Sequence, residues 1–280
     1  MSRYHLFQPN WLGFDYIFFD CDSTLSTIEG IDELARKKGN FDQVKRLTDA
    51  AMEGEIHLES VYDHRLKLLA PTRAEIQEIA QHYRQTLVPD VIEVIRALQQ
   101  VNKELFIVSG GLLAAVKPFG EWLGIPHKNI CAVDVYYNNL SGNWWDYQQD
   151  RWGQRPDVKC IKSKTSPLVA SLGKADVVRD LLGGRIGRTM LVGDGMSDIA
   201  AKSVVDLVVG FGGVVTRERV VAEAEVFIKC ETLAPILPLA LSKTEQSVLS
   251  RTLYKSTLDK GLALIEAGEV TFKEQTGISS

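Results

Sequence analysis

Cysteine is scarce in this chain, and none of it is paired in sequence. Four cysteines occur among 280 residues, at positions 21, 131, 160 and 230. No two of them form the closely spaced C-x-x-C pair that zinc ribbons and dithiol redox motifs use. The spacing therefore argues against both functions, and we expect four free thiols.

Long apolar runs are also missing. No stretch approaches the roughly 18 consecutive apolar residues that a membrane-spanning helix needs. The first residues, Met1 to Leu6, lack the apolar segment of a secretory signal. We therefore expect a cytoplasmic protein without a membrane partner.

An excess of positive charge is missing too. The 32 Lys and Arg residues stand against 36 Asp and Glu residues, a formal net charge of −4. This balance gives no broad attraction to nucleic acid, so no nucleic-acid partner is expected, and any anionic ligand must be held by local basic residues. With 45% hydrophobic and 24% charged residues, the composition is that of a globular protein with a sizeable core.

The most informative motif is Asp20-Cys21-Asp22-Ser23-Thr24, which directly follows the apolar run Tyr16 to Phe19. Alternation along a strand places Asp20 and Asp22 side by side at its carboxyl end, where open parallel sheets bind ligands. Two neighbouring carboxylates at the end of a buried strand repel each other, and a divalent cation would relieve that repulsion. The alternative is a solvated turn in which Asp22 only caps the next helix.

Strand and helix patterns alternate along most of the chain. Apolar strand patterns occur at 14–20, 105–111, 189–192, 207–210 and 226–228. We expect 226–228 to be the last strand of the chain. Helical patterns lie between them, at 91–98, 175–182, 199–203 and 218–224. Strand, crossover and strand units of this kind predict an α/β fold with a doubly wound, mostly parallel sheet.

One segment between the first two strands breaks this alternation. Residues 26–85 show only helical patterns, which predict a small helical domain inserted after the first strand. The core would then comprise residues 1–25 and 86–241.

Two further segments extend the core. A hairpin of Val133–Tyr137 with Asn143–Tyr147 is expected, within an insertion at 138–167. The insertion contains Trp144, Trp145, Tyr147 and Trp152. It is either a surface hairpin whose aromatic residues cover one another or a second lid over the site. One helix is expected over 244–266, within a C-terminal extension at 242–280 that either docks on the core or forms a homodimer contact.

Polar residues also occur at the ends of two later strands. Ser109-Gly110-Gly111 offers a hydroxyl and backbone amides that suit a phosphate oxygen, although a simple tight turn is the alternative. Gly193-Asp194-Gly195 with Asp198 forms a loop whose glycines permit close approach of a ligand. Lys174 begins a helix and could bring a positive charge to the same place, although a lone Lys is more often solvated.

These strand ends supply an acidic cluster, a hydroxyl with amides and an ammonium group. The residues are Asp20, Asp22, Asp194, Asp198, Ser109, Gly110 and Lys174. Oxygen ligands of this kind suit Mg²⁺, which binds one or two carboxylates together with phosphate. The combination predicts phosphoryl transfer.

The order of motifs D-x-D-S-T, S-G-G, K and G-D-G-x-x-D resembles the haloacid dehalogenase superfamily. Within it the chain is similar to the phosphoserine phosphatases over most of residues 14–230. The more specific features of this resemblance are Glu29 to Ala35, Ala51-Met52 followed by Arg65, and Gly210 to Gly213. Met196-Ser197 departs from the family, in which a small residue followed by Asn or Thr is commoner.

The resemblance implies a mechanism. Asp20 would be the nucleophile that forms an aspartyl-phosphate, and Asp22 would be the general acid and base. Mg²⁺ would be the cofactor, held by Asp20, the backbone carbonyl of Asp22, and Asp194, with Asp198 in support. Lys174 and Ser109 would stabilise charge on the phosphoryl oxygens.

The same resemblance implies how the small-molecule substrate, phosphoserine, is selected. Glu29 would receive its ammonium group, Arg65 would pair with its carboxylate, and Met52 would provide an apolar wall. The other substrate-binding residues would be Ser109, Gly110, Gly111, Lys174 and Ser197. The helical insertion 26–85 would act as a cap that excludes water.

Three functions stay open at this point. The first is a Mg²⁺-dependent phosphoserine phosphatase. The second is a phosphatase for another small phosphomonoester, or a phosphotransferase that passes phosphate from phosphoserine to an alcohol. The third is a phosphate-ligand binding protein without catalysis.

Overall fold

The central element of the fold is one large sheet. The structure, a computed structural model, describes residues 12–273 except 54, 144, 146–154 and 171. Within these residues the sheet has seven strands in the order β3-β2-β1-β6-β7-β8-β9. They are β1 (Tyr16–Phe19), β2 (Glu104–Leu112), β3 (Ile130–Val133), β6 (Thr189–Gly193), β7 (Leu207–Phe211), β8 (Val226–Ile228) and β9 (Val270–Phe272). Each pair is parallel except β8 with β9, so the mostly parallel sheet is confirmed.

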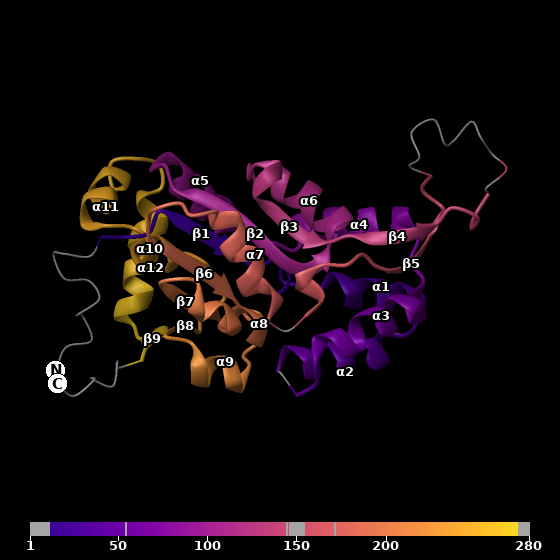
Figure 1. The fold of residues 1–280 in the computed structure, drawn as a ribbon. Coiled ribbons are helices and arrows are strands. Elements are labelled where there is room, and N and C mark those ends of the chain that lie inside the picture. The colour runs from indigo at the N-terminus through magenta and orange to yellow at the C-terminus, as the bar shows by residue number, and fades with distance from the viewer. Residues whose placement is uncertain (1–11, 54, 144, 146–154, 171, 274–280) are drawn as a thin grey trace.

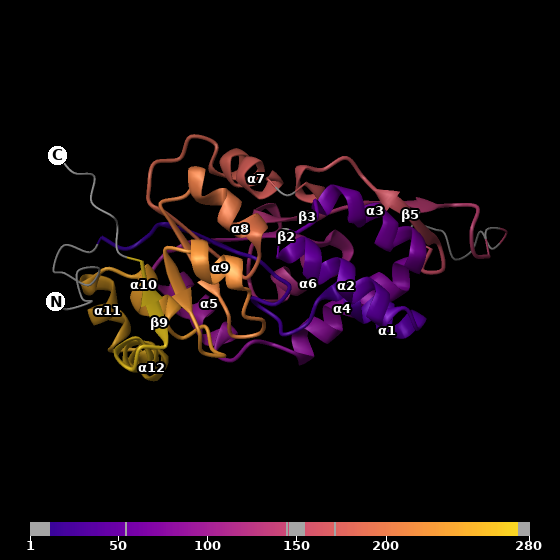
Figure 2. The ribbon, with the colours of Figure 1, turned by 90° about the horizontal axis from the view of Figure 1, so that it is seen from below.

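Burial explains why β1 is an interior strand of this sheet, between β2 and β6. Ile17, Phe18 and Phe19 are fully buried, and the ring of Phe18 stacks on Phe106 of β2 at 4.4 Å between centroids. Helices pack on both sides of the sheet (Figures 1 and 2). They include α5 (Val91–Gln100), α6 (Leu113–Trp122), α7 (Gly173–Leu182), α8 (Met196–Ile199), α9 (Glu218–Glu223) and α10 (Ile236–Ala240). Across the described residues, every helix is too short or too polar to cross a lipid bilayer.

Four helices follow β1 before the chain returns to the sheet. They are α1 (Gly30–Lys38), α2 (Phe41–Met52), α3 (Leu58–Leu69) and α4 (Arg73–Gln85). The start of α4 is defined by a capping box in which Thr72 and Glu75 satisfy each other's backbone N–H groups. In Figure 1 this group lies to one side of the sheet, with α4 beside α6.

The expected hairpin at 133–147 is wrong in its pairing. Residues 130–133 belong to the main sheet as β3, and β4 (Val135–Asn138) pairs with β5 (Lys159–Ser163) in a separate antiparallel sheet. The turn after Asn138 does not reverse the chain directly into a strand. Residues 144, 146 and 147 of the expected partner strand lie outside the described residues, and Asn143 and Trp145 belong to no strand.

The small sheet reaches the helical insertion through its backbone. The amide of Cys160 donates to the carbonyl of Pro71 at 2.8 Å, and the amide of Arg73 donates to the carbonyl of Val158 at 3.0 Å. The segment therefore pairs with the α3–α4 connection. Of its notable aromatic residues, only Trp145 lies within the described residues, where it is exposed, so the second-lid prediction stays untested.

The single helix expected at 244–266 is also wrong. It is divided into α11 (Lys243–Leu249) and α12 (Lys255–Glu266). Between them the hydroxyls of Ser250 and Thr252 donate to nearby backbone carbonyls at 2.8 and 2.7 Å, and such bonds compete with helical ones. The chain then adds β9, so β8 is not the last strand as expected. The pattern missed β9 because it has only three residues.

Candidate active site

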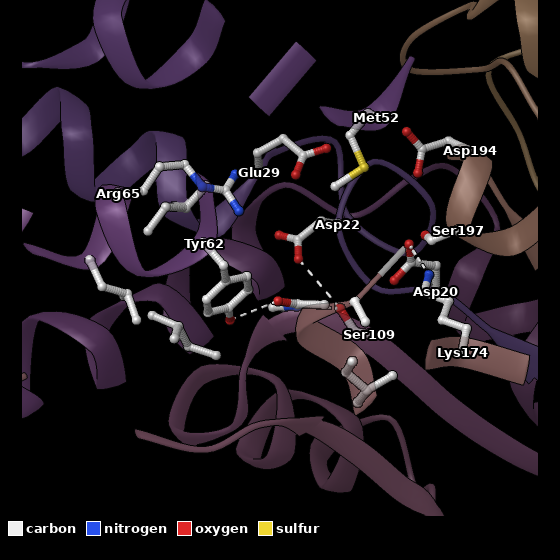
Figure 3. Close-up of a pocket in the computed structure, with 17 residues that line it drawn as sticks. Asp20, Asp22, Glu29, Met52, Tyr62, Arg65, Ser109, Lys174, Asp194 and Ser197 are labelled. Atoms are coloured by element: carbon white, nitrogen blue, oxygen red, sulfur yellow. Dashed lines mark hydrogen bonds and ion pairs between the residues drawn. The ribbon is translucent and has the colours of Figure 1, made fainter. Parts of the chain in front are cut away.

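The carboxyl ends of β1, β2 and β6 surround one pocket (Figure 3). The parallel register brings the segments after these strands together, and the amide of Asp20 donates to the carbonyl of Val192 at 2.9 Å. All predicted site residues except Asp198 line the pocket. They are Asp20, Asp22, Glu29, Met52, Arg65, Ser109, Gly110, Gly111, Lys174, Asp194 and Ser197. Asp198 lies next to the pocket, against Lys174.

Three buried carboxylates meet at one side of the pocket. One oxygen from each of Asp20, Asp194 and Asp198 lies within 4.8 Å of the others. Burial is the main cause that raises the pKa of Asp194 and of Asp198 to about 7, and the charge of Asp20 contributes to both values. Such a set of oxygen donors fits a divalent cation, because a cation would stabilise the buried carboxylates in their charged form and reduce the repulsion between them.

Lys174 balances part of this negative charge. Its Nζ lies 2.6 Å from Asp20 Oδ2 and 2.6 Å from Asp198 Oδ1, and its side chain is almost fully buried. Burial by itself lowers the pKa of Lys174, but the charges of Asp198 and Asp20 outweigh it, so the pKa lies above its ordinary value. The ammonium therefore stays charged at the edge of the pocket.

Asp22 has different surroundings from the other carboxylates. Its Oδ1 accepts from the amide of Gly30 at 2.7 Å and from the hydroxyl of Tyr83 at 2.6 Å. The hydroxyl of Ser109 donates to Oδ2 at 3.5 Å. Burial raises the pKa of Asp22 to about 7 against the effect of the Tyr83 hydrogen bond. A carboxyl group with this pKa suits general acid and base catalysis near neutral pH.

The Ser109-Gly110-Gly111 segment lies next to Asp22. The amide of Gly111 donates to the hydroxyl of Ser109 at 3.0 Å, and the hydroxyl of Tyr62 on α3 donates to the carbonyl of Gly110 at 2.9 Å. A Cβ atom at Gly111 would lie 2.6 Å from Asp22 Oδ2. A glycine is therefore required here for the close approach of the two segments.

Glu29, which precedes α1, brings an acid to the other side of the pocket. It accepts from the hydroxyl of Ser23 at 2.7 Å. Burial, followed by the charge of Asp22, raises the pKa of Glu29 to about 8. A ligand with an ammonium group would favour the charged form of this carboxyl.

Arg65 of α3 brings a guanidinium group to the same side as Glu29, and Met52, the last residue of α2, lines the same pocket on the other side of Glu29 (Figure 3). Arg65 is only 4% exposed. Its Nη1 donates to the hydroxyl of Thr48 at 3.0 Å, while its Nε has no hydrogen-bond partner among the described residues. Burial lowers its pKa. A buried cation with a free donor is suited to an anionic ligand.

Sequence reasoning missed Arg217 and Tyr83. Arg217 precedes α9, is 2% exposed, and places its Nε 3.1 Å from Asp194 Oδ2 and its Nη2 3.8 Å from Glu29 Oε1. Its sequence context, Thr-Arg-Glu-Arg, resembles an exposed helix start and gives no sign of burial. Tyr83 falls within the helical pattern of residues 26–85, which predicts no role for its hydroxyl. A Cβ atom at Gly30 would lie 2.4 Å from the Tyr83 hydroxyl, so the glycine makes room for this hydroxyl, but only the structure shows the two residues together.

Comparisons with known proteins identify a family, similar sequences and similar solved structures. Residues 17–202 match the family of haloacid dehalogenase-like hydrolases. A chloroplastic phosphoserine phosphatase of Arabidopsis thaliana is 32% identical, over 80% of this chain and 72% of its own length. A phosphoserine phosphatase of Bos taurus is also 32% identical, over 76% of this chain and 88% of its own length. A solved structure described as a phospho-aspartyl intermediate analogue of phosphoserine phosphatase superposes with a TM-score of 0.66 at 24% identity. The match covers 80% of this chain and 97% of that chain, and it supports the fold.

Proposed function

Because the chain belongs to the haloacid dehalogenase-like hydrolase family, we propose that it is a Mg²⁺-dependent phosphatase that hydrolyses O-phosphoserine to serine and phosphate. One observation carries the choice of substrate. The pocket that holds the acid cluster and Lys174 also holds Glu29 and Arg65, a pair suited to the ammonium and carboxylate groups of an amino acid. The cytoplasmic location and the homodimer contact stay predictions.

The two carboxyl groups of the D-x-D motif divide the chemistry. A carboxylate oxygen of Asp20 attacks phosphorus, the bond from phosphorus to the serine oxygen breaks, and the carboxyl proton of Asp22 passes to that oxygen. Asp22 then takes a proton from water, whose oxygen attacks the aspartyl-phosphate and releases phosphate from Asp20. Both carboxyl groups return to their starting states. The pKa of about 7 supports this role, because Asp22 is then substantially protonated when the cycle begins.

The remaining polar groups hold the phosphoryl group and the cation. Ser109, Gly110 and Lys174 surround the expected position of the phosphoryl oxygens. Asp20, Asp194 and the backbone carbonyl of Asp22 would hold Mg²⁺, with Asp198 in support. Bound there, the ion would withdraw negative charge from the phosphoryl oxygens and ease the approach of a carboxylate.

The helical insertion would act as a cap over the substrate. Glu29 precedes α1, Met52 ends α2 and Arg65 lies on α3, so these helices supply the groups for the amino-acid end of the ester. The sheet supplies the groups for the phosphoryl end. Ser197, at the start of α8, lines the same pocket and lies close to Asp20 (Figure 3). The groups that select the substrate are therefore on different elements from the groups that carry out the reaction.

Phosphate release tests this function directly. We expect turnover of phosphoserine with Mg²⁺ and none after chelation, because Lys174 alone would then balance the charge of three carboxylates next to the phosphoryl group. Against phosphothreonine, phosphoethanolamine and phosphoglycolate, the value of kcat/KM for phosphoserine should be at least about tenfold higher, a difference of about 1.4 kcal/mol. A preference for another ester would show that phosphoserine is not the substrate. Absence of turnover with every ester would contradict the proposal that the protein is a phosphatase.

Replacing Arg65 by Ala tests the choice of substrate. We expect kcat/KM for phosphoserine to fall at least about 100-fold, because two charge-assisted hydrogen bonds to the substrate carboxylate are lost. Hydrolysis of phosphoethanolamine, which lacks the carboxylate, should change by less than about threefold. Lys67→Ala, on the exposed side of the same helix, is the matched control and should leave both rates unchanged. Equal losses on both substrates would remove Arg65 from the selection role.

A further inference from the structure

Arg65 has an unusual set of partners for a buried cation. Among the described residues, no carboxylate oxygen lies within ion-pair distance of its guanidinium group, whose hydrogen-bond partner is the hydroxyl of Thr48. The ring of Tyr62 lies 5.5 Å from its central carbon, and Nε is buried without a partner. A buried guanidinium held by one neutral oxygen keeps most of its charge available to a ligand.

Thr48 lies between this cation and a buried acid. It is fully buried on α2, and its Oγ1 accepts from Arg65 Nη1 at 3.0 Å. The same oxygen lies 3.0 Å from Asp32 Oδ1 and 3.1 Å from the carbonyl of Val44, both of which only accept. A hydroxyl has a single proton, so that proton must point to one of these two acceptors. The charged oxygen of Asp32 is the stronger acceptor.

The resulting chain runs from Asp32 through Thr48 to Arg65. Asp32 is 5% exposed, and its other oxygen lies 3.9 Å from Nζ of Lys45. The carboxylate orients the hydroxyl, and the hydroxyl then presents a lone pair to Nη1 of Arg65. Three helices, α1, α2 and α3, contribute one member each, so packing of the helical insertion fixes the plane of the guanidinium group.

We propose that Thr48 is a positioning residue for substrate selection: its hydroxyl holds Arg65 by one nitrogen and keeps Arg65 from pairing directly with Asp32. This role rests on the proposed function, in which Arg65 binds the carboxylate of phosphoserine. A direct ion pair with Asp32 would occupy the guanidinium fork and neutralise its charge. The intervening hydroxyl leaves Nε and further N–H groups free for two parallel hydrogen bonds to a carboxylate.

Thr48→Val tests the role, because valine has the shape of threonine without the hydroxyl. We expect KM for phosphoserine to rise about tenfold or more with kcat nearly unchanged, while KM and kcat for phosphoethanolamine stay within about twofold. Thr48→Ser, which restores the hydroxyl, should return KM for phosphoserine to within about threefold of wild type. Thr257→Val, a buried threonine of α12, is the matched control and should change neither substrate.

A double-mutant cycle separates positioning from a general effect on the fold. In an Arg65→Ala background, Thr48→Val should have no further effect on phosphoserine, because the residue through which it acts is gone. If Thr48→Val does not fold, Thr48→Cys takes its place, since it keeps the volume with only weak hydrogen bonding.

The outcomes distinguish this role from the function on which it rests. Wild-type protein that turns over neither ester would overturn both proposals. Active wild type with unchanged KM for phosphoserine in Thr48→Val would overturn the positioning role alone. So would equal losses on both esters, or an undiminished effect of Thr48→Val in the Arg65→Ala background.

Discussion

Replacing Asp20 by Asn is expected to lower kcat for phosphoserine by at least about 10⁴-fold while the protein stays folded. The amide is nearly isosteric but is a poor nucleophile, and it removes one of the two carboxylates that flank Lys174 at 2.6 Å. Asp198 still pairs with Lys174, so the ammonium does not become an unpaired buried charge. Loss of activity without loss of fold is therefore the expected pattern.

Single-turnover phosphate release with Mg²⁺ measures this effect, and urea unfolding checks the fold. Asp206→Asn is the matched control, because Asp206 accepts from the amide and hydroxyl of Thr189 at the amino end of β6, the opposite end from the pocket. It should retain kcat within about twofold. Retention of normal turnover in Asp20→Asn would remove Asp20 as the nucleophile and with it the aspartyl-phosphate.

The main sheet and the position of the pocket could be predicted because they depend on local patterns and on one geometric rule. Apolar runs such as 16–19 and 189–192 predict buried strands, and the carboxyl ends of parallel strands share an edge. Asp20 and Asp194 directly follow two such strands, Ser109 lies near the carboxyl end of a third, and all three residues line one pocket in the structure. The catalytic and binding roles of these residues stay proposals.

The contacts that complete the pocket could not be predicted in the same way, because they join segments with no local signal. The ring of Tyr83 fits the apolar positions of the helix pattern. The pattern therefore does not reveal that its hydroxyl donates to Asp22. Arg217 is buried only because the loop before α9 turns it toward Asp194. Thr48 lies in the middle of α2, and nothing in the neighbouring sequence marks it as special. Its role depends on how α1, α2 and α3 pack. Pairing of β4 with β5 likewise depends on a long connection rather than on a turn motif.

Replacing Lys174 by Met should separate catalysis from stability. Methionine keeps the apolar stem and removes the ammonium, so Asp20 and Asp198 lose their shared partner and a third carboxylate, Asp194, remains close. We expect kcat to fall roughly 10²- to 10³-fold, because a fixed positive charge next to the phosphoryl oxygens is lost. Without Mg²⁺, the free energy of unfolding should fall by about 3–5 kcal/mol, the usual effect of breaking a buried ion pair.

Addition of Mg²⁺ should then narrow the stability difference between Lys174→Met and wild type without restoring kcat. A cation bound among Asp20, Asp194 and Asp198 replaces the lost neutralising charge, but it does not replace the donor to the phosphoryl group. Urea unfolding with and without Mg²⁺, together with kcat, measures the two effects separately. Lys103→Met is the matched control, since Lys103 is a buried lysine paired with Glu245 before the amino end of β2, and it should lose stability in a Mg²⁺-independent way with kcat intact. If Mg²⁺ leaves the difference in unfolding free energy unchanged, the three carboxylates do not bind a cation. If kcat of Lys174→Met falls by less than about tenfold, Lys174 does not act on the phosphoryl group.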